Sequence, residues 1–190
     1  YTKIKEYVGQ YKNIIDLYCG TGSIGIFVNE TNSVTGIEIN EHAIKDANKN
    51  KKLNNLNNVN FICGDSGKKS KDLNLNPDII IVDPPRSGLN KETINNVINL
   101  NANEIIYVSC DPMTLVRDLN ILSEHYIIKE ITPFDMNITN SFIYNENFKN
   151  GYSNMNILSL DQSNITNADG ADVEMAEVDR YYGKLEKTIT

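Results

Sequence analysis

Residues 13–25, NIIDLYCGTGSIG, pass from an apolar run to a glycine turn and then to the start of a helix. The apolar run at 14–17 is typical of a strand that is covered on both faces. Gly20, Gly22 and Gly25 then follow the spacing G-x-G-x-x-G. In this spacing the first glycine permits a tight turn, the second lets backbone approach a ligand, and the third lets the helix pack close to the strand. The stretch predicts a ligand-binding corner, although such turns also join strands to helices that bind nothing.

The next acidic residue indicates which ligand to expect at this corner. Residues 33–39, SVTGIEI, are predicted as a second strand, and Glu38 stands at its carboxyl end. An acid in that place can accept hydrogen bonds from both hydroxyls of a ribose. A dinucleotide such as NAD would bring pyrophosphate to the helix N-terminus, whereas S-adenosylmethionine would bring a sulfonium and a carboxylate. The corner alone leaves both ligands open.

Helical segments separate the predicted strands along most of the chain. This alternation predicts an α/β fold with a mostly parallel central sheet, right-handed crossovers and helices on both faces. The sequence also predicts a helix within residues 1–11, a solvated loop at 68–71 and a strand at 155–160. The remaining predicted strands are 59–63, 78–82, 104–109 and 126–131, and the remaining predicted helices are 23–29, 41–53, 91–100 and 114–122.

Polar residues also follow three further strands at the expected ligand edge of the sheet. Asp65 comes directly after 59–63, where it either receives the exocyclic amine of an adenine or caps a helix. Asp83 opens the segment DPPRSGL, whose two prolines keep the backbone extended beyond the strand. Cys110 comes directly after the predicted strand at 104–109.

Length and composition favour one soluble catalytic domain. The chain has 190 residues, of which 40% are hydrophobic, and no apolar run long enough to span a membrane, so we expect a cytoplasmic protein. Its three cysteines are odd in number and lack metal-ligand spacing, which predicts free thiols. The net charge of −7 does not suggest a free-standing nucleic-acid binder. Residues 161–190 are acidic and polar and are predicted to form a weakly ordered tail.

Three segments together carry a family resemblance. DLYCGTGSIG, VDPPRSGL and VSCDPMTLVRD, in this order and spacing, resemble the S-adenosylmethionine-dependent RNA (uracil-5-)methyltransferase family. The likeness covers residues 1–136. It implies a Rossmann-like class I methyltransferase catalytic domain over residues 1–160, atypical from about 137 on. It also chooses S-adenosylmethionine over NAD, because a hydride-transfer enzyme has no need of the second and third segments.

The resemblance implies the reaction and its residues. A methyl group would pass from S-adenosylmethionine to carbon 5 of a uridine in ribosomal or transfer RNA, through a covalent adduct with Cys110. Cys19 and Cys63 are interpreted as packing residues. The positions that the resemblance assigns to the cofactor are Tyr18, Gly20, Gly22, Ser23, Glu38, Asp65 and Asp83.

The chain also departs from the family pattern. The family places a glutamate, the proton-abstracting base, nine residues after the aspartate of a segment like PFDM, but Tyr144 stands there and Glu146 two residues further on. The base is therefore unassigned. The upstream part of the family, which carries RNA-binding surface, is absent, so we expect the RNA substrate to need it, and we expect no DNA and no membrane partner. The alternatives are a catalytically impaired cofactor-binding fragment of the family and a class I methyltransferase that acts on cytosine carbon 5 or on protein.

Overall fold

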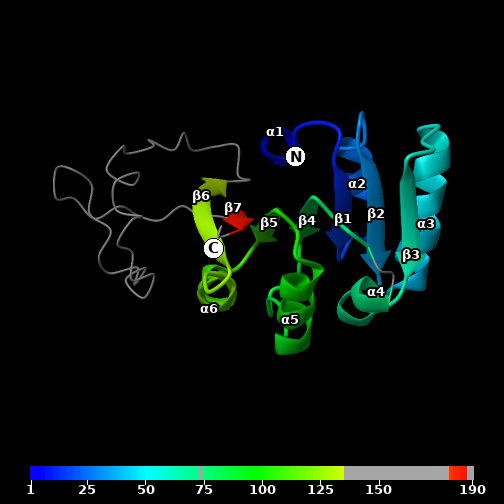
Figure 1. Ribbon diagram of the computed structural model, residues 1–190. Helices are drawn as coiled ribbons and strands as arrows, with labels where there is room; N and C mark the ends of the chain where they lie inside the picture. The colour runs from blue at the N-terminus through cyan, green and yellow to red at the C-terminus, as the bar shows by residue number, and fades with distance from the viewer. Residues whose placement is uncertain (73–74, 135–179, 188–190) are drawn as a thin grey trace, which may run out of the picture.

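The computed structural model describes residues 1–72, 75–134 and 180–187, in which helices and strands alternate (Figure 1). The helices are α1 (Thr2–Val8), α2 (Ser23–Phe27), α3 (Glu41–Leu53), α4 (Ser66–Asp72), α5 (Lys91–Leu100) and α6 (Pro112–Leu122). The strands are β1 (Asn13–Leu17), β2 (Ser33–Glu38), β3 (Val59–Cys63), β4 (Ile79–Val82), β5 (Glu104–Ser109), β6 (Tyr126–Phe134) and β7 (Arg180–Lys187). Among the described residues no helix is both long and apolar enough to cross a membrane.

All the strands form one sheet in the order β3-β2-β1-β4-β5-β7-β6. The first five are parallel, and β7 pairs antiparallel with both β5 and β6. The chain runs outward from β1 to β3 and then returns to place β4 on the other side of β1. In open α/β sheets, such a reversal of strand order creates a crevice at the carboxyl ends of the strands.

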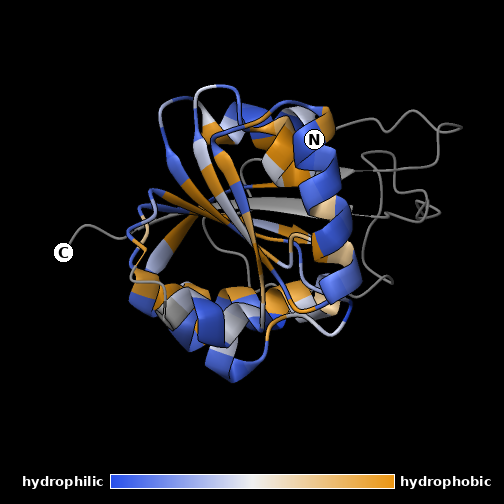
Figure 2. Ribbon diagram, turned by 90° about the vertical axis from the view of Figure 1, so that its right-hand side faces the viewer, coloured by the Kyte–Doolittle hydropathy of each residue, from blue (hydrophilic) through white to orange (hydrophobic). Residues whose placement is uncertain are grey.

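Two hydrophobic clusters hold helices against opposite faces of this sheet. One cluster joins α1, α2 and α3 to the first face, and the other joins α5 and α6 to the second. Strand β4 is buried along its whole length, and its residues alternate between the clusters, Ile79 and Ile81 in one, Ile80 and Val82 in the other. Figure 2 shows hydrophobic residues gathered in the strands and hydrophilic residues along the outer sides of the helices. The predicted fold class is thus confirmed.

Two local predictions are wrong. Residues 68–71 belong to α4, not to a loop, because Asp65 caps that helix and the buried Asn96 of α5 donates its side-chain amide hydrogen to the Gly67 carbonyl at 2.7 Å. Arg180–Lys187 forms β7 within the predicted weakly ordered tail, since it hydrogen-bonds to strands on both sides and buries Leu185. The predicted strand at 155–160 and residues 161–179 of the tail lie outside the described residues.

Candidate functional site

The residues assigned to the site lie along one edge of the sheet. Leu17 pairs with Ile37 on one side and Val82 on the other, so the carboxyl ends of β1, β2 and β4 are level. Val82 in turn pairs with Tyr107 of β5. In sheet order the edge carries Asp65 after β3, Glu38 at the end of β2, the turn from Tyr18 to Ser23 after β1, Asp83 after β4 and Cys110 after β5.

The turn after β1 has a left-handed backbone at three positions. The angle φ is +63° at Tyr18, +53° at Gly20 and +82° at Gly22. A residue with a side chain seldom adopts this conformation, and such outliers cluster at ligand sites. The Gly22 N–H donates to the Cys19 carbonyl at 2.8 Å and closes the turn, after which α2 begins at Ser23. The corner predicted from the sequence is therefore a tight turn that leads directly into a helix.

Glu38 is bonded to this turn. Its Oε2 accepts a hydrogen bond from the Gly20 N–H at 3.2 Å, and its Oε1 accepts one from the Asn40 N–H at 2.9 Å. The carboxylate thus links the end of β2 to the glycine turn. Each oxygen of a carboxylate has a second lone pair, so both can still accept a hydrogen bond from a ligand hydroxyl.

Two glycines of the motif, Gly22 and Gly25, and Gly36 of β2 also have a packing role. A Cβ atom on Gly22 would lie 2.8 Å from Cε1 of Phe61, and one on Gly36 would lie 2.6 Å from its Cδ1. A Cβ atom on Gly25 would lie 3.0 Å from Cγ1 of Val34. The third glycine therefore lets α2 pack close to the sheet, as predicted. The second glycine lies against a protein ring, a neighbour that the spacing did not reveal.

Asp16 is a site residue that sequence reasoning missed. It lies in β1, fully buried, and its Oδ2 accepts a hydrogen bond from the Gly25 N–H at 3.1 Å. Its Oδ1 has no hydrogen-bond partner among the described residues. Burial raises the pKa of Asp16 to about 7, and the nearby Asp83 carboxylate contributes to the increase. An acid inside an apolar run just before the glycine motif was the available signal.

Tyr18 and Asp65 are held by hydrogen bonds on the α4 side of the edge. The Tyr18 N–H donates to Oγ of the buried Ser66 at 3.3 Å, and the Tyr18 hydroxyl donates to Oγ1 of Thr93 at 3.5 Å. Asp65 Oδ1 accepts a hydrogen bond from the Lys68 N–H at 3.0 Å. Asp65 therefore caps α4, one of its two predicted roles, and its contact with an adenine stays a prediction.

Cys110 occupies a sharp bend between β5 and α6 and is partly exposed. On one side, the Ser109 Oγ donates to the Asp111 carbonyl at 2.9 Å and accepts from the Asp111 N–H at 3.1 Å. On the other side, Asp111 Oδ1 accepts from the Thr114 N–H at 2.9 Å and caps α6. These bonds determine the path of the backbone on both sides of the thiol.

The other two cysteines have different surroundings. Cys19 is 8% exposed, and burial raises the pKa of its thiol above the usual range, so its interpretation as a packing residue is confirmed. The same interpretation is wrong for Cys63, whose side chain is exposed because it ends the edge strand β3. Cys63 is separated from Cys110 by the full width of β2, β1 and β4.

Comparison with known proteins identifies the relatives of this chain. The sequence model of the tRNA (Uracil-5-)-methyltransferase family matches residues 3–151. The chain belongs to this family. The resemblance inferred from the three motifs is therefore confirmed.

Individual relatives and solved structures are similar to this chain to different degrees. An uncharacterized RNA methyltransferase of Clostridium tetani is 44% identical over 140 residues, which cover 72% of this chain and 31% of the relative. The tRNA (uracil-54, C5)-methyltransferase of Pyrococcus abyssi, solved in complex with S-adenosyl-L-homocysteine, is 34% identical with a TM-score of 0.62, over 71% of this chain and 33% of that chain. The precorrin-6y C5,15-methyltransferase of Geobacter metallireducens, at 15% identity and a TM-score of 0.66 over 98% of this chain and 86% of that chain, shares the fold.

The chain spans about a third of the length of the curated relatives it matches. S-adenosyl-L-homocysteine, bound to the Pyrococcus abyssi protein, is what remains of S-adenosylmethionine after methyl transfer. This ligand agrees with S-adenosylmethionine, not NAD, as the cofactor. The candidate positions for the catalytic base, Tyr144 and Glu146, lie outside the described residues.

Proposed function

We propose that this chain is the catalytic part of an RNA methyltransferase that methylates carbon 5 of a uridine in ribosomal or transfer RNA, with S-adenosylmethionine as the methyl donor. Family membership supports RNA methylation. The observation that carries the finer proposal is the position of Cys110 directly after β5. Strand β5 lies beside β4, which leads into Asp83, and β4 separates β5 from β1 and its glycine turn. A thiol in this place adjoins a donor bound over the turn.

The residues along the edge suit this donor. Glu38 has acceptor capacity left for the two ribose hydroxyls, and the left-handed turn at Tyr18 and Gly20 lies directly beside it. In this proposal Asp65 receives the adenine amine, and Asp83 lies near the methionine end. Gly22 and Ser23 complete the turn, and Ser23 is exposed at the start of α2. The order of these residues across four strands matches the order of adenine, ribose and methionine in the donor.

The chemistry explains the need for a cysteine. When bound, S-adenosylmethionine supplies an electrophilic methyl group on its sulfonium sulfur. Carbon 5 of uracil is too weakly nucleophilic to take that group, so the Cys110 thiolate first adds to carbon 6 and makes carbon 5 enolate-like. Carbon 5 then bonds to the methyl group as the bond from that group to sulfur breaks, and the electron pair stays on the sulfur of the departing S-adenosyl-L-homocysteine. A base finally removes the carbon 5 proton, and the electron pair restores the double bond as the thiolate leaves.

An RNA that contains 5-fluorouridine tests the role of Cys110. Fluorine at carbon 5 cannot leave as a proton, so the adduct is trapped after methyl transfer, even if the base is missing. We expect a covalent complex that depends on S-adenosylmethionine, maps to Cys110 and disappears in Cys110→Ala. Cys63→Ala is the matched control, because Cys63 is an exposed cysteine at the same edge. An adduct that survives Cys110→Ala would contradict the assignment.

Calorimetry separates the alternatives. Binding of S-adenosylmethionine without any adduct, even at low salt and high RNA concentration, would favour the second candidate, a cofactor-binding fragment that does not turn over. The observation behind that candidate is that Tyr144, not a glutamate, stands at the position where the family has its proton-abstracting base. Tight binding of NAD with no response to S-adenosylmethionine would contradict both candidates.

A further inference from the structure

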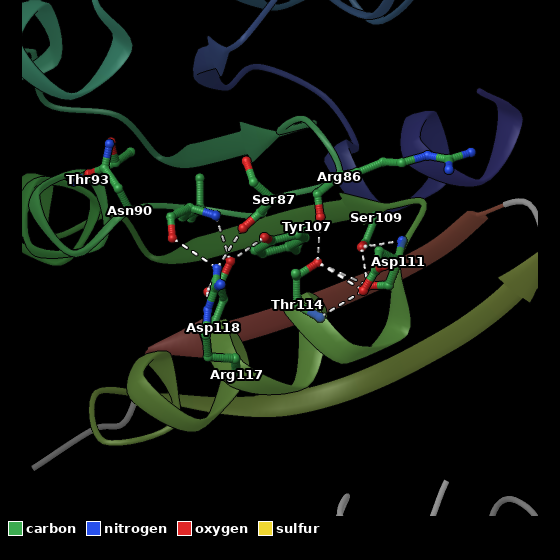
Figure 3. A network of polar contacts seen from close by, with 11 residues as sticks. Arg86, Ser87, Asn90, Thr93, Tyr107, Ser109, Asp111, Thr114, Arg117 and Asp118 are labelled. Carbon is green, nitrogen blue, oxygen red and sulfur yellow. Dashed lines mark hydrogen bonds and ion pairs between the residues drawn. The ribbon is translucent and has the colours of Figure 1, made fainter. Parts of the chain in front are cut away.

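A buried carboxylate on α6 joins three parts of the site. Asp118 is 0% exposed, and its Oδ2 accepts hydrogen bonds from the Leu89 N–H at 2.7 Å and from the Tyr107 hydroxyl at 2.7 Å (Figure 3). Its Oδ1 accepts from Nε of Arg117 at 2.9 Å and lies 2.8 Å from Nη2. Burial, together with the bond to Asp118, raises the pKa of Tyr107, so this phenol keeps its proton and remains a donor. Asp118 is thus bonded to β5, to its own helix and to the loop after β4.

That loop, Asp83 to Leu89, is held mainly through its backbone. Nη2 of Arg117 donates to the Ser87 carbonyl at 2.9 Å and to the Leu89 carbonyl at 3.1 Å. The Thr114 hydroxyl, one turn earlier in α6, donates to the Arg86 carbonyl at 3.1 Å. Together with the bond from the Leu89 N–H, these bonds attach the backbone of Arg86, Ser87 and Leu89 to one face of α6. We call Tyr107, Thr114, Arg117 and Asp118 the loop-holding network.

Gly88 lets the loop approach the network. Its φ is +69°, and a Cβ atom there would lie 2.6 Å from both Arg117 Nη2 and Asp118 Oδ2. The backbone of the loop therefore rests directly on the charged pair. A side chain at this position would be strained by its conformation and would also push the loop away.

The hydrogen-bond partners of the network indicate that it positions the Asp83–Leu89 loop more than it stabilises the fold. A buried ion pair is by itself weak evidence for stability, because desolvation offsets the attraction between its charges. The Arg117 side chain is 51% exposed, and its Nη2 donates to two carbonyls of a surface loop, not to the core. That loop begins at Asp83, next to the proposed methyl donor, whereas Tyr107 and Thr114 lie three residues before and four after Cys110.

We propose that Arg117 and Asp118 are positioning residues that hold the Asp83–Leu89 loop at a fixed place relative to Cys110. This inference rests on the proposed function, because it assumes that uridine binds between the loop and the thiol. Holding the loop in this way requires the planar guanidinium of Arg117. A fork of donors can bond a carboxylate and two carbonyls at once, which a lysine ammonium on the same stem cannot do with the same geometry.

Arg117→Lys tests whether the guanidinium holds the loop, because the variant keeps the positive charge beside Asp118 and removes the forked set of N–H donors that bond the loop carbonyls. Trypsin cuts after Arg86, which is exposed within the loop. We expect cleavage of the Arg86–Ser87 bond in the folded chain to accelerate at least tenfold, while cleavage after Lys45 in α3, which follows unfolding of the domain, changes much less. Gly88→Ala, a second variant on the loop side, should accelerate cleavage after Arg86 by more than cleavage after Lys45, which rises only as far as the variant lowers the stability of the whole domain; Asn120→Ala on the exposed side of α6 is the control. Equal acceleration at both sites, or none, would overturn the proposal.

A second measurement tests the consequence for the reaction. Arg117→Lys should form the 5-fluorouridine adduct at least tenfold more slowly than wild type, while alkylation of Cys110 by iodoacetamide keeps its rate, because the thiol itself is untouched. An adduct rate that falls no more than the alkylation rate would refute a positioning role. If wild type forms no adduct, the proposed function fails, and trypsin cleavage after Arg86 still decides whether the network holds the loop.

Discussion

Replacement of Asp16 by asparagine tests the electrostatics of the cofactor corner. Burial raises the pKa of Asp16 from the ordinary 3.8 to about 7, with a contribution from Asp83. Between these values the folded chain keeps a proton that the unfolded chain releases, so the stability of the wild type falls as the pH rises. The difference of about three pKa units corresponds to about 4 kcal/mol in total. This loss of folding stability is absent below about pH 4, where Asp16 is protonated in both states, and complete above about pH 7, where it is ionised in both.

Asp16→Asn keeps the shape of the side chain and cannot ionise, so its stability should lack this pH dependence. We expect the free energy of unfolding of the variant, relative to wild type, to increase by about 2 kcal/mol between about pH 5.5 and pH 8, which is the part of the titration that falls in that interval. The direction of this change does not depend on the constant cost of burying the amide.

The assay is urea unfolding, followed by circular dichroism at several pH values without cofactor. Asp46→Asn, an exposed carboxylate on α3, is the control for the loss of one negative charge. A difference between Asp16→Asn and wild type that stays constant within about 0.5 kcal/mol across this range would refute the reasoning, since it would mean that Asp16 is ionised in the folded chain throughout.

Three further predictions concern the turn and the loop. Glu38→Ala should weaken binding of S-adenosylmethionine by roughly 1.5–3 kcal/mol in calorimetry, and it should lower the melting temperature because the Gly20 and Asn40 N–H groups lose their acceptor; unchanged affinity would refute the ribose assignment. Phe61→Ala should lower the free energy of unfolding by about 3–5 kcal/mol, since it leaves a cavity beneath the turn; a loss under about 1 kcal/mol would contradict that packing. Gly88→Ala should cost roughly 1–3 kcal/mol in the same assay because of its positive φ, and no loss would show that the loop simply moves.

The sequence determined the order of elements and the edge on which the site lies. Apolar runs, glycines and prolines are local signals, so the bounds of α3, α5 and β5 agree with the prediction to the residue. The alternation of strands and helices then requires the carboxyl ends of the parallel strands to meet on one side. For this reason the sequence alone predicts that Glu38, Asp83 and Cys110 lie at a common edge of the sheet, and the strand order agrees.

Only the tertiary structure decided the features that depend on contacts between distant residues. β7 exists because Arg180–Lys187 pairs with β5 and β6, and an acidic, polar composition gives no sign of a partner so far away in the chain. The burial that raises the pKa of Asp16 arises when helices cover both faces of the sheet. In the sequence, Asp118 similarly looks like any acidic residue of a helix. Only folding brings the loop after β4 to it, with the Leu89 nitrogen 2.7 Å from Asp118 Oδ2. Burial and hydrogen-bond partnership are properties of the packed chain, and local sequence patterns do not contain them.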